Sequence, residues 1–188
     1  AVRGYQENGL ACCGKHFPGI GAITQDPEQM LPTLMNTERR FMKEMKPFKA
    51  AIRQARLEAV MTGHVSYPTI VRDGKPATLS PSLVGFNLRN QLNFRGLTIS
   101  DFIGKKAVTS NNTIEEAVLL AIKAGVDIVL FGPDKDIQEK GHKSLKDAIE
   151  SGYFSEDRLN KSLERIVRQK HRRSQMRYPM REDPAPMI

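Results

Sequence analysis

The sequence predicts an α/β fold in which parallel strands alternate with helices. Four short segments are almost continuously apolar, which is typical of strands covered on both faces. Helical patterns lie between these segments, and this alternation indicates a parallel sheet with helices packed outside it. Four strand–helix units make half of an eight-stranded (β/α)8 barrel, because a closed barrel needs about 250 residues and this chain has 188.

The strands are expected where the apolar runs stand, at residues 9–17, 57–65, 96–101 and 127–132. Short connections and right-handed crossovers place consecutive parallel strands side by side, so we expect the four to pair in chain order. Their carboxyl ends then meet at one rim of the sheet, which is where the chemistry of a β/α barrel takes place.

The first three helices are indicated by apolar spacing and by start signals. Over residues 36–56, apolar side chains recur at three- and four-residue intervals from Phe41 to Ile52, and residues 82–92 show a similar pattern. Residues 113–124 follow an Asn-Asn-Thr start signal and carry two glutamates in the first turn, where the helix dipole favours acidic side chains.

Two further helices are expected at residues 143–151 and 155–173. Gly152 is a plausible stop for the first, and Ser155 followed by two acidic residues is a good start for the second. Residues 1–173 are therefore expected to form one domain. A basic, proline-containing tail at residues 174–188 is expected to be poorly ordered.

The composition is that of an ordinary soluble globular protein, with 39% hydrophobic and 27% charged residues. No apolar run approaches the roughly 20 residues that span a bilayer, so no membrane span is expected. The chain opens at Ala1 without a charged and apolar leader, which indicates a processed chain or a piece of something longer. With that reservation, we expect a cytoplasmic protein.

The only cysteines, Cys12 and Cys13, are adjacent within an expected strand. Consecutive strand side chains point to opposite faces, so these two are poorly placed to bridge each other. We expect small buried hydrophobes in a reducing compartment, in preference to a redox or metal role.

The formal net charge of +8 raises the question of a nucleic-acid partner. Much of the excess sits at the end of the chain, in Arg165, Arg168, Lys170, Arg172, Arg173, Arg177 and Arg181. A basic final helix is usually a solvated face, and neither an aromatic-interleaved RNA motif nor zinc-finger spacing is present. The sequence thus favours a solvated face over a nucleic-acid site.

Polar side chains follow three of the expected strands. Lys15 and His16 stand in the run KHFPG at the end of the first strand, His64 ends the second, and Asp101 ends the third. A carboxylate at the mouth of a barrel can act as nucleophile, general base or ligand. From its position alone, Asp101 could equally cap the following segment. No cluster has zinc-ligand spacing, so no metal or cofactor is expected.

Several ordered motifs match a known family. They are GKHFPG at 14–19, VMTGHV at 60–65, PATLS at 76–80, FRGLTISD at 94–101, AIKAGVDIVL at 121–130 and SGYFSEDRLNKSLERIVRQK at 151–170. The chain resembles the C-terminal half of the catalytic TIM barrel of a glycoside hydrolase family three β-N-acetylhexosaminidase. The resemblance runs from about residue 4 to residue 172, and implies the second half of the barrel.

The resemblance implies a role for each candidate residue. Asp101 sits where the family has its catalytic nucleophile, and Lys15 with His16 where sugar hydroxyls are gripped. His64 adds a second imidazole at the same rim and is expected to bind the substrate with Lys15 and His16. In a retaining glycosidase the nucleophile lies about 5–5.5 Å from the acid/base and forms a covalent intermediate. We expect Lys15 and His16 to keep positive charge beside Asp101 and so favour its ionised form.

The loop after KHFPG departs from the family pattern, which continues His-Gly-Asp-Thr, two residues, then Asp-Ser-His. Its last histidine is the family's acid/base, and Glu28 stands in that place here, with Asp26 retained. Ile20 and Ala22 replace polar residues, and Phe102 replaces a commonly acidic one. Repulsion from Asp26 could keep Glu28 protonated and fit to donate a proton.

Two functions remain open. In the first, the chain is part of a retaining glycosidase that releases terminal β-linked N-acetylglucosamine from peptidoglycan or chitin-type fragments. Asp101 is then the nucleophile and Glu28 the acid/base. In the second, the chain is a degenerate, non-catalytic relative that serves as a scaffold or a glycan-binding subunit. Either way, we expect a complementary half barrel or another protein chain along the exposed edges of the first and fourth strands.

Overall fold

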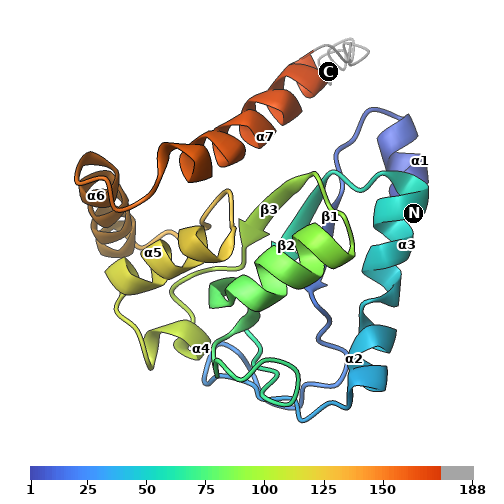
Figure 1. Ribbon diagram of the computed structural model, residues 1–188, viewed down its shortest axis with the longest axis horizontal. Helices are drawn as coiled ribbons and strands as arrows, with labels where there is room; N and C mark the ends of the chain where they lie inside the picture. The colour runs from blue at the N-terminus through green and yellow to red at the C-terminus, as the bar shows by residue number, and fades with distance from the viewer. Residues whose placement is uncertain (175–188) are drawn as a thin grey trace, which may run out of the picture.

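The computed structural model describes residues 1–174 and shows an α/β fold built on a parallel sheet. In the described residues the sheet has three strands, β1 (Cys13–Phe17), β2 (Ala59–Thr62) and β3 (Leu97–Ser100), which pair in chain order. This confirms the predicted order and direction of the first three strands. Figure 1 shows the sheet with helices on both sides of it.

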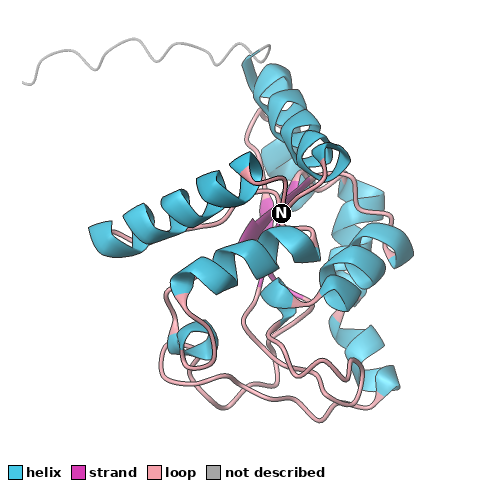
Figure 2. Ribbon diagram, turned by 60° about the vertical axis from the view of Figure 1, so that its left-hand side comes forward, coloured by secondary structure: helices cyan, strands magenta, loops and turns pink. Residues whose placement is uncertain are grey.

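Helices surround the sheet, as Figure 2 shows. Their bounds are α1 (Val2–Glu7), α2 (Glu38–Glu44), α3 (Lys46–Ala55), η1 (Ala77–Leu79), η2 (Ser82–Gln91), α4 (Lys106–Thr109), α5 (Ile114–Ala124), α6 (Lys135–Glu150) and α7 (Glu156–Ser174). The α1, α4 and η1 segments were not predicted. They are short, and short helices carry little periodic signal.

The expected fourth strand at residues 127–132 is not formed as such. Within residues 1–174 this segment joins β3 through a single bridge, between Ile99 and Ile128. Side chains take up bonds that a strand ladder would use: the Leu130 N–H donates to Ser100 Oγ at 2.8 Å, and the Thr98 N–H to Asp127 Oδ2 at 2.9 Å. The segment therefore lies along β3 without extending the ladder.

Two helix predictions need correction. The helix expected at 36–56 is two helices, because Pro47 lies in the first turn of α3 and has no N–H to continue α2. The helix expected at 143–151 begins eight residues earlier, at Lys135, where the Asp134 side chain accepts from the Ile137 N–H. The remaining helix predictions hold to within a residue or two, although η2 has π-helical hydrogen bonding.

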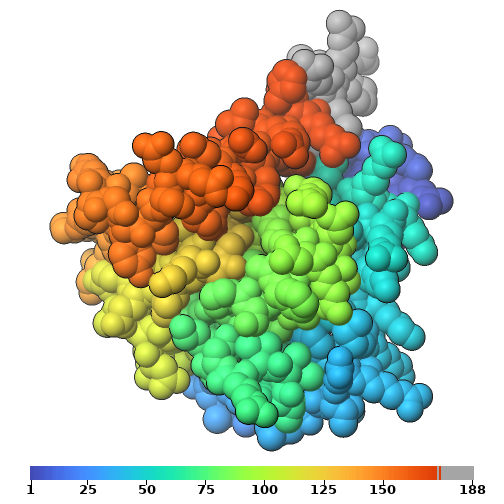
Figure 3. Space-filling view, in the orientation of Figure 1, coloured from blue at the N-terminus to red at the C-terminus, as the bar shows by residue number. Residues whose placement is uncertain are grey.

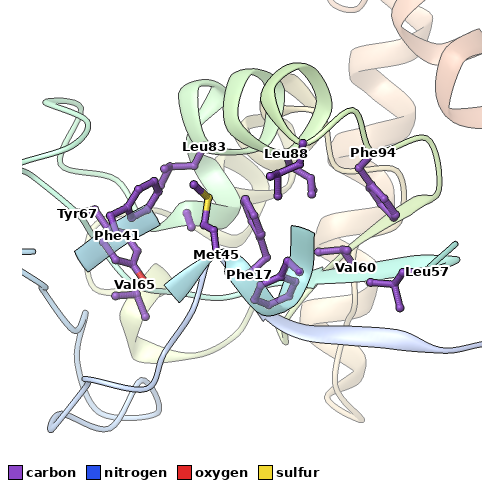
Figure 4. Close-up of a cluster of buried hydrophobic side chains, with 13 residues drawn as sticks. Phe17, Phe41, Met45, Leu57, Val60, Val65, Tyr67, Leu83, Leu88 and Phe94 are labelled. Carbon is purple, nitrogen blue, oxygen red and sulfur yellow. The ribbon is translucent and has the colours of Figure 1, made fainter. Parts of the chain in front are cut away.

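The largest core cluster fills the space between the sheet, α2, α3 and η2. Figure 4 shows Leu88 of η2 above Phe17 of the sheet, and Leu83 of the same helix beside Phe41 and Tyr67. Phe17 also meets Phe48 of α3 edge-on, with ring centroids 5.4 Å apart. A second cluster packs α4 and α5 against the region after β3. These contacts fix the strand ends that carry the polar residues.

A buried carboxylate ties α7 to the start of β3. Asp127 accepts from Arg89 at 2.6 Å, Arg165 at 2.8 Å and Ser162 at 2.6 Å, and its side chain is fully buried. Arg158 of α7 also donates to two backbone carbonyls, that of Ile122 in the last turn of α5 and that of Val126 just before Asp127. Figure 3 shows α7 lying across one end of the molecule.

The cysteine and tail predictions fare differently. Cys12 is half-buried against the core, but Cys13 is exposed, so the expectation that both are buried is wrong. Cys13 lies on β1, whose outer edge has no neighbouring strand among the described residues.

The predicted tail at 174–188 falls almost wholly outside the described residues. In the part of the chain that is described, no helix is long and apolar enough to span a membrane.

Candidate active site

The candidate site lies at the carboxyl ends of the three strands. His16 is the penultimate residue of β1, and Asp101 directly follows β3. Backbone bonds hold these ends together: the Gly63 N–H donates to Phe17 O at 2.8 Å, and the Asp101 N–H to Thr62 O at 3.1 Å. Because all three strands are parallel, their last residues meet at one rim, as the sequence predicted.

Both oxygens of the Asp101 carboxylate are engaged. The Phe102 N–H donates to Oδ1 at 2.7 Å, and Lys105 Nζ donates to Oδ2 at 2.8 Å. Burial by itself would raise the pKa of Asp101, but the hydrogen bonds from Lys105 and Phe102 outweigh it, and the pKa lies below its ordinary value. Asp101 is therefore ionised at neutral pH, which is the state that a nucleophile requires.

His16 and Lys15 lie beside this carboxylate in different ways. His16 Nε2 is 3.8 Å from Asp101 Oδ2, too far for a hydrogen bond. Burial lowers the pKa of His16 despite the attraction of Asp101, so the imidazole is neutral at pH 7. Lys15 is exposed, and lines with His16 a hollow of about 520 Å³ between β1 and α3. The sequence predicted that Lys15 and His16 would supply the positive charge beside Asp101. The cation in contact with Asp101 is instead Lys105.

His64 lies behind the site. It is 1% exposed, and its Nε2 lies 2.9 Å from Phe102 O, so this nitrogen donates to the carbonyl. Nδ1 is buried and has no hydrogen-bond partner among the described residues. Burial lowers the pKa of His64 to about 4. This placement suits support of the turn after β3 better than the direct sugar contact expected from the sequence.

Lys105 is the site residue that sequence reasoning missed. Its ammonium contacts Asp101 at 2.8 Å and Glu28 Oε1 at 3.2 Å, and its side chain is 16% exposed. Burial opposes the charge of Lys105, but its bonds to Asp101 and Glu28 outweigh burial and raise its pKa. The sequence offered one signal, because Lys105 stands four residues after Asp101. That spacing brings the two side chains together only if the intervening residues form a turn.

The loop at residues 20–32 brings Glu28 to this lysine. The Ala107 N–H of α4 donates to Pro27 O at 3.1 Å, which fixes the loop beside the turn that carries Lys105. Asp26 accepts from the Glu28 N–H at 2.9 Å and so shapes its own turn. The Glu28 side chain, 52% exposed, pairs with Lys105. This is a different electrostatic setting from the repulsion by Asp26 that the sequence predicted.

The shared lysine places two carboxylates close together. Since the oxygens of Asp101 and Glu28 lie 2.8 Å and 3.2 Å from one nitrogen atom, they are at most 6.0 Å apart. Retaining glycosidases separate their carboxylates by about 5–5.5 Å, and inverting ones by about 6.5–9.5 Å. This upper limit lies below the range of the inverting enzymes. In residues 1–174, no group of three or more histidine, cysteine or acidic side chains could hold a metal ion.

Comparison with known proteins gives consistent relatives. The model of the Glycosyl hydrolase family 3 N terminal domain matches residues 1–169. The chain is 35% identical to a Beta-hexosaminidase of Idiomarina loihiensis over 135 residues, covering 71% of the chain and 40% of that protein. It is 38% identical to a Beta-hexosaminidase of Actinobacillus pleuropneumoniae over 131 residues, covering 69% and 37%.

Solved structures agree with these relatives. A glycoside hydrolase family 3 beta-N-acetylglucosaminidase from Paenibacillus superposes with a TM-score of 0.89 at 31% identity, covering 100% of this chain and 36% of that one. The beta-N-acetylglucosaminidase from Thermotoga maritima gives 0.79 at 32% identity, covering 89% and 36%. The matched family model describes an N terminal domain, whereas the sequence suggested the C-terminal half of a barrel. The chain spans less than half of each relative.

Proposed function

The chain belongs to glycoside hydrolase family 3, and from this premise we propose that it contributes the reacting carboxylates of a retaining glycosidase. The substrate is terminal β-linked N-acetylglucosamine on peptidoglycan or chitin-type fragments. The names of the relatives support this substrate, since they are beta-hexosaminidases and beta-N-acetylglucosaminidases. The observation that carries the proposal is the pairing of Asp101 and Glu28 around Lys105.

The chemistry is a double displacement. Asp101 attacks the anomeric carbon while protonated Glu28 gives its proton to the glycosidic oxygen, whose bond to the sugar breaks with both electrons leaving on that oxygen. The product is a glycosyl ester on Asp101. Glu28, now a carboxylate, takes a proton from water as the water attacks the same carbon, and this frees Asp101. Lys15 and the neutral His16 supply donors for sugar hydroxyls.

A second candidate is a non-catalytic scaffold or glycan-binding subunit. Two observations favour it: both oxygens of Asp101 are already engaged within the protein, and Ile20 and Ala22 stand half-buried where the family has polar residues. In this role Asp101 serves to organise the turn after β3 through its bonds to Phe102 and Lys105.

The two candidates are separated by activity in a complete barrel. We join this chain to the remaining part of the Idiomarina relative and assay release of an aryl group from an aryl N-acetyl-β-glucosaminide. The Asp101→Ala variant should abolish release, because no other group forms the ester. A fusion that binds N-acetylglucosamine without turnover would favour the scaffold.

The role of Glu28 is tested by the leaving group. Glu28→Gln should slow substrates with poor leaving groups by about 10²- to 10⁴-fold and good ones far less, since only poor ones need a proton. Glu164→Gln, an exposed position on α7, serves as the control and should leave both rates unchanged. Equal slowing of both substrate classes by Glu28→Gln would remove Glu28 as the acid.

A further inference from the structure

Lys105 joins the two carboxylates that the proposed reaction uses in turn. Its ammonium lies 2.8 Å from Asp101 Oδ2 and 3.2 Å from Glu28 Oε1, so it can pair with either without a change of rotamer. The neighbouring imidazole does not supply this charge, because burial lowers the pKa of His16 and leaves it neutral at pH 7. Lys105 is thus the cation in contact with both reacting groups.

The backbone around Lys105 is anchored on both sides. Its carbonyl accepts from the Val108 N–H at 2.9 Å and the Thr109 N–H at 3.0 Å, which fixes the start of α4. The Ala107 N–H holds Pro27 O at 3.1 Å, so the loop that carries Glu28 is attached to the same turn. Both ends of the ion pair with Glu28 therefore belong to one linked unit, which holds Glu28 toward Asp101.

Resting on the function proposed above, we propose that Lys105 is a positioning residue that pairs with whichever of the two carboxylates is ionised at each stage. Before attack, Asp101 is charged and Glu28 holds the proton. After attack, Asp101 is a neutral ester and Glu28 has lost its proton to the departing oxygen. The site carries one negative and one positive charge in both states.

This charge balance has a physical consequence for the rate. Each displacement moves a negative charge from one carboxylate to the other across a partly dry site, where an unpaired charge is costly. A fixed cation between the two stabilises the carboxylate that exists and the one that forms, with no solvent reorganisation. The cation therefore accelerates both half-reactions. A cation in contact with only one carboxylate would accelerate only one of them.

The pairing is tested on the chain itself by titration. We label the side-chain carboxyl carbon of Asp with ¹³C and follow Asp101 by NMR against pH. Lys105→Met and Lys105→Gln should raise the titration midpoint of Asp101, because its bond to Lys105 helps to lower the pKa, whereas Lys105→Arg should largely preserve it. Lys106→Met, which removes the exposed neighbouring lysine, is the matched control and should leave the Asp101 midpoint unchanged. An unchanged Asp101 midpoint in both uncharged variants overturns the proposal.

The catalytic part is tested in the fused complete barrel. Lys105→Met should slow formation and hydrolysis of the glycosyl ester together, each by about tenfold or more, the effect of losing one contact with an ionised group. Lys105→Arg should restore most of both rates. If the wild-type fusion turns over and Lys105→Met slows only one step, the proposed role of Lys105 is wrong, while the proposed glycosidase function stands. If the wild type forms no ester, the proposed function falls, and this step with it.

Discussion

His64 fills a buried position behind the turn at Phe102, with one ring nitrogen bonded and the other without a partner in the described residues. Such a site accepts a neutral imidazole and rejects a charged one, because a buried cation has neither water nor a counter-ion in contact. The turn at Phe102 leads directly to Lys105, so the state of this histidine bears on the geometry of the candidate site.

The buried imidazole makes stability depend on pH. The pKa of His64 is about 4 in the fold, against 6.5 for a free histidine. In this range the imidazole is protonated in the unfolded chain and neutral in the folded one. The free energy of unfolding therefore falls as pH drops from about 6.5 toward 4. Between about pH 7.5 and pH 5 the loss due to His64 should be about 2 kcal/mol. Urea unfolding of His64→Gln at both pH values should show a loss smaller by this amount.

His142 provides the control for this measurement, since it is exposed on α6. The His142→Gln variant should lose as much stability on acidification as the wild type. If His64→Gln did the same, the imidazole would be accommodated in its charged form, and the account of its burial would be wrong.

Residue-level prediction of position succeeded at the ends of the strands. Lys15, His16 and Asp101 were found from that position and from the family motifs, and the parallel sheet brings their strand ends to one rim. Lys105 was missed because its relation to Glu28 spans 77 positions of sequence and depends on a loop docking onto α4. No periodic pattern records such a contact.

At the level of elements, α7 is attached to the sheet by charge as much as by apolar packing. Asp127 receives two guanidinium groups and a hydroxyl in a fully buried position. Burial lowers the pKa of Arg89 to about 10, despite the attraction of Asp127, yet leaves it charged at neutral pH. Removing one partner from such a cluster leaves the others buried and unpaired.

The Asp127→Asn variant should therefore be strongly destabilised. Breaking a buried ion pair by removing one partner costs about 3–5 kcal/mol, and urea unfolding at neutral pH measures it. Asp147→Asn on α6 removes an exposed ion pair with Lys143 and should leave the urea midpoint almost unchanged. Similar small effects for both variants would mean that apolar contacts alone hold α7 in place.

Element prediction failed where side chains replaced backbone partners. The segment at 127–132 has the composition of a buried strand, yet Ser100 and Asp127 take up the bonds that a ladder would have used. The helix expected at 36–56 kept its apolar spacing across Pro47, so periodicity alone hid the break. The apolar pattern located these segments, and polar contacts between them decided their final form.

At the scale of the whole molecule, the described residues leave a strand edge and several large apolar side chains exposed. The outer edge of β1 has no partner strand in the described residues. Leu163 and Val167 lie one turn apart on α7 and are 55% and 62% exposed. Leu10 is 48% exposed just before β1. An open parallel-sheet edge beside exposed apolar side chains favours association with other protein surfaces.

The chain alone should therefore associate in solution. Light scattering at rising concentration should report species larger than a 21.1 kDa monomer, through pairing at the edge of β1 and contacts of α7. In the fusion with the remaining barrel units, the same measurement should report a monomer, because those surfaces are then covered. A monodisperse, cooperatively melting monomer of the chain alone would contradict this expectation.

The separation of the Asp127 cluster from the site bears on how this protein can evolve. The cluster anchors the starting end of the sheet, while Asp101 and Glu28 occupy the opposite end, on a short turn and a loop. Barrels of this kind change chemistry through their loops while the opposite face maintains the fold. Glu28 stands on such a loop, half-exposed, so mutation can sample other side chains at this position without loss of the anchored frame. A fold so divided can keep its structure while the chemistry of its loops changes.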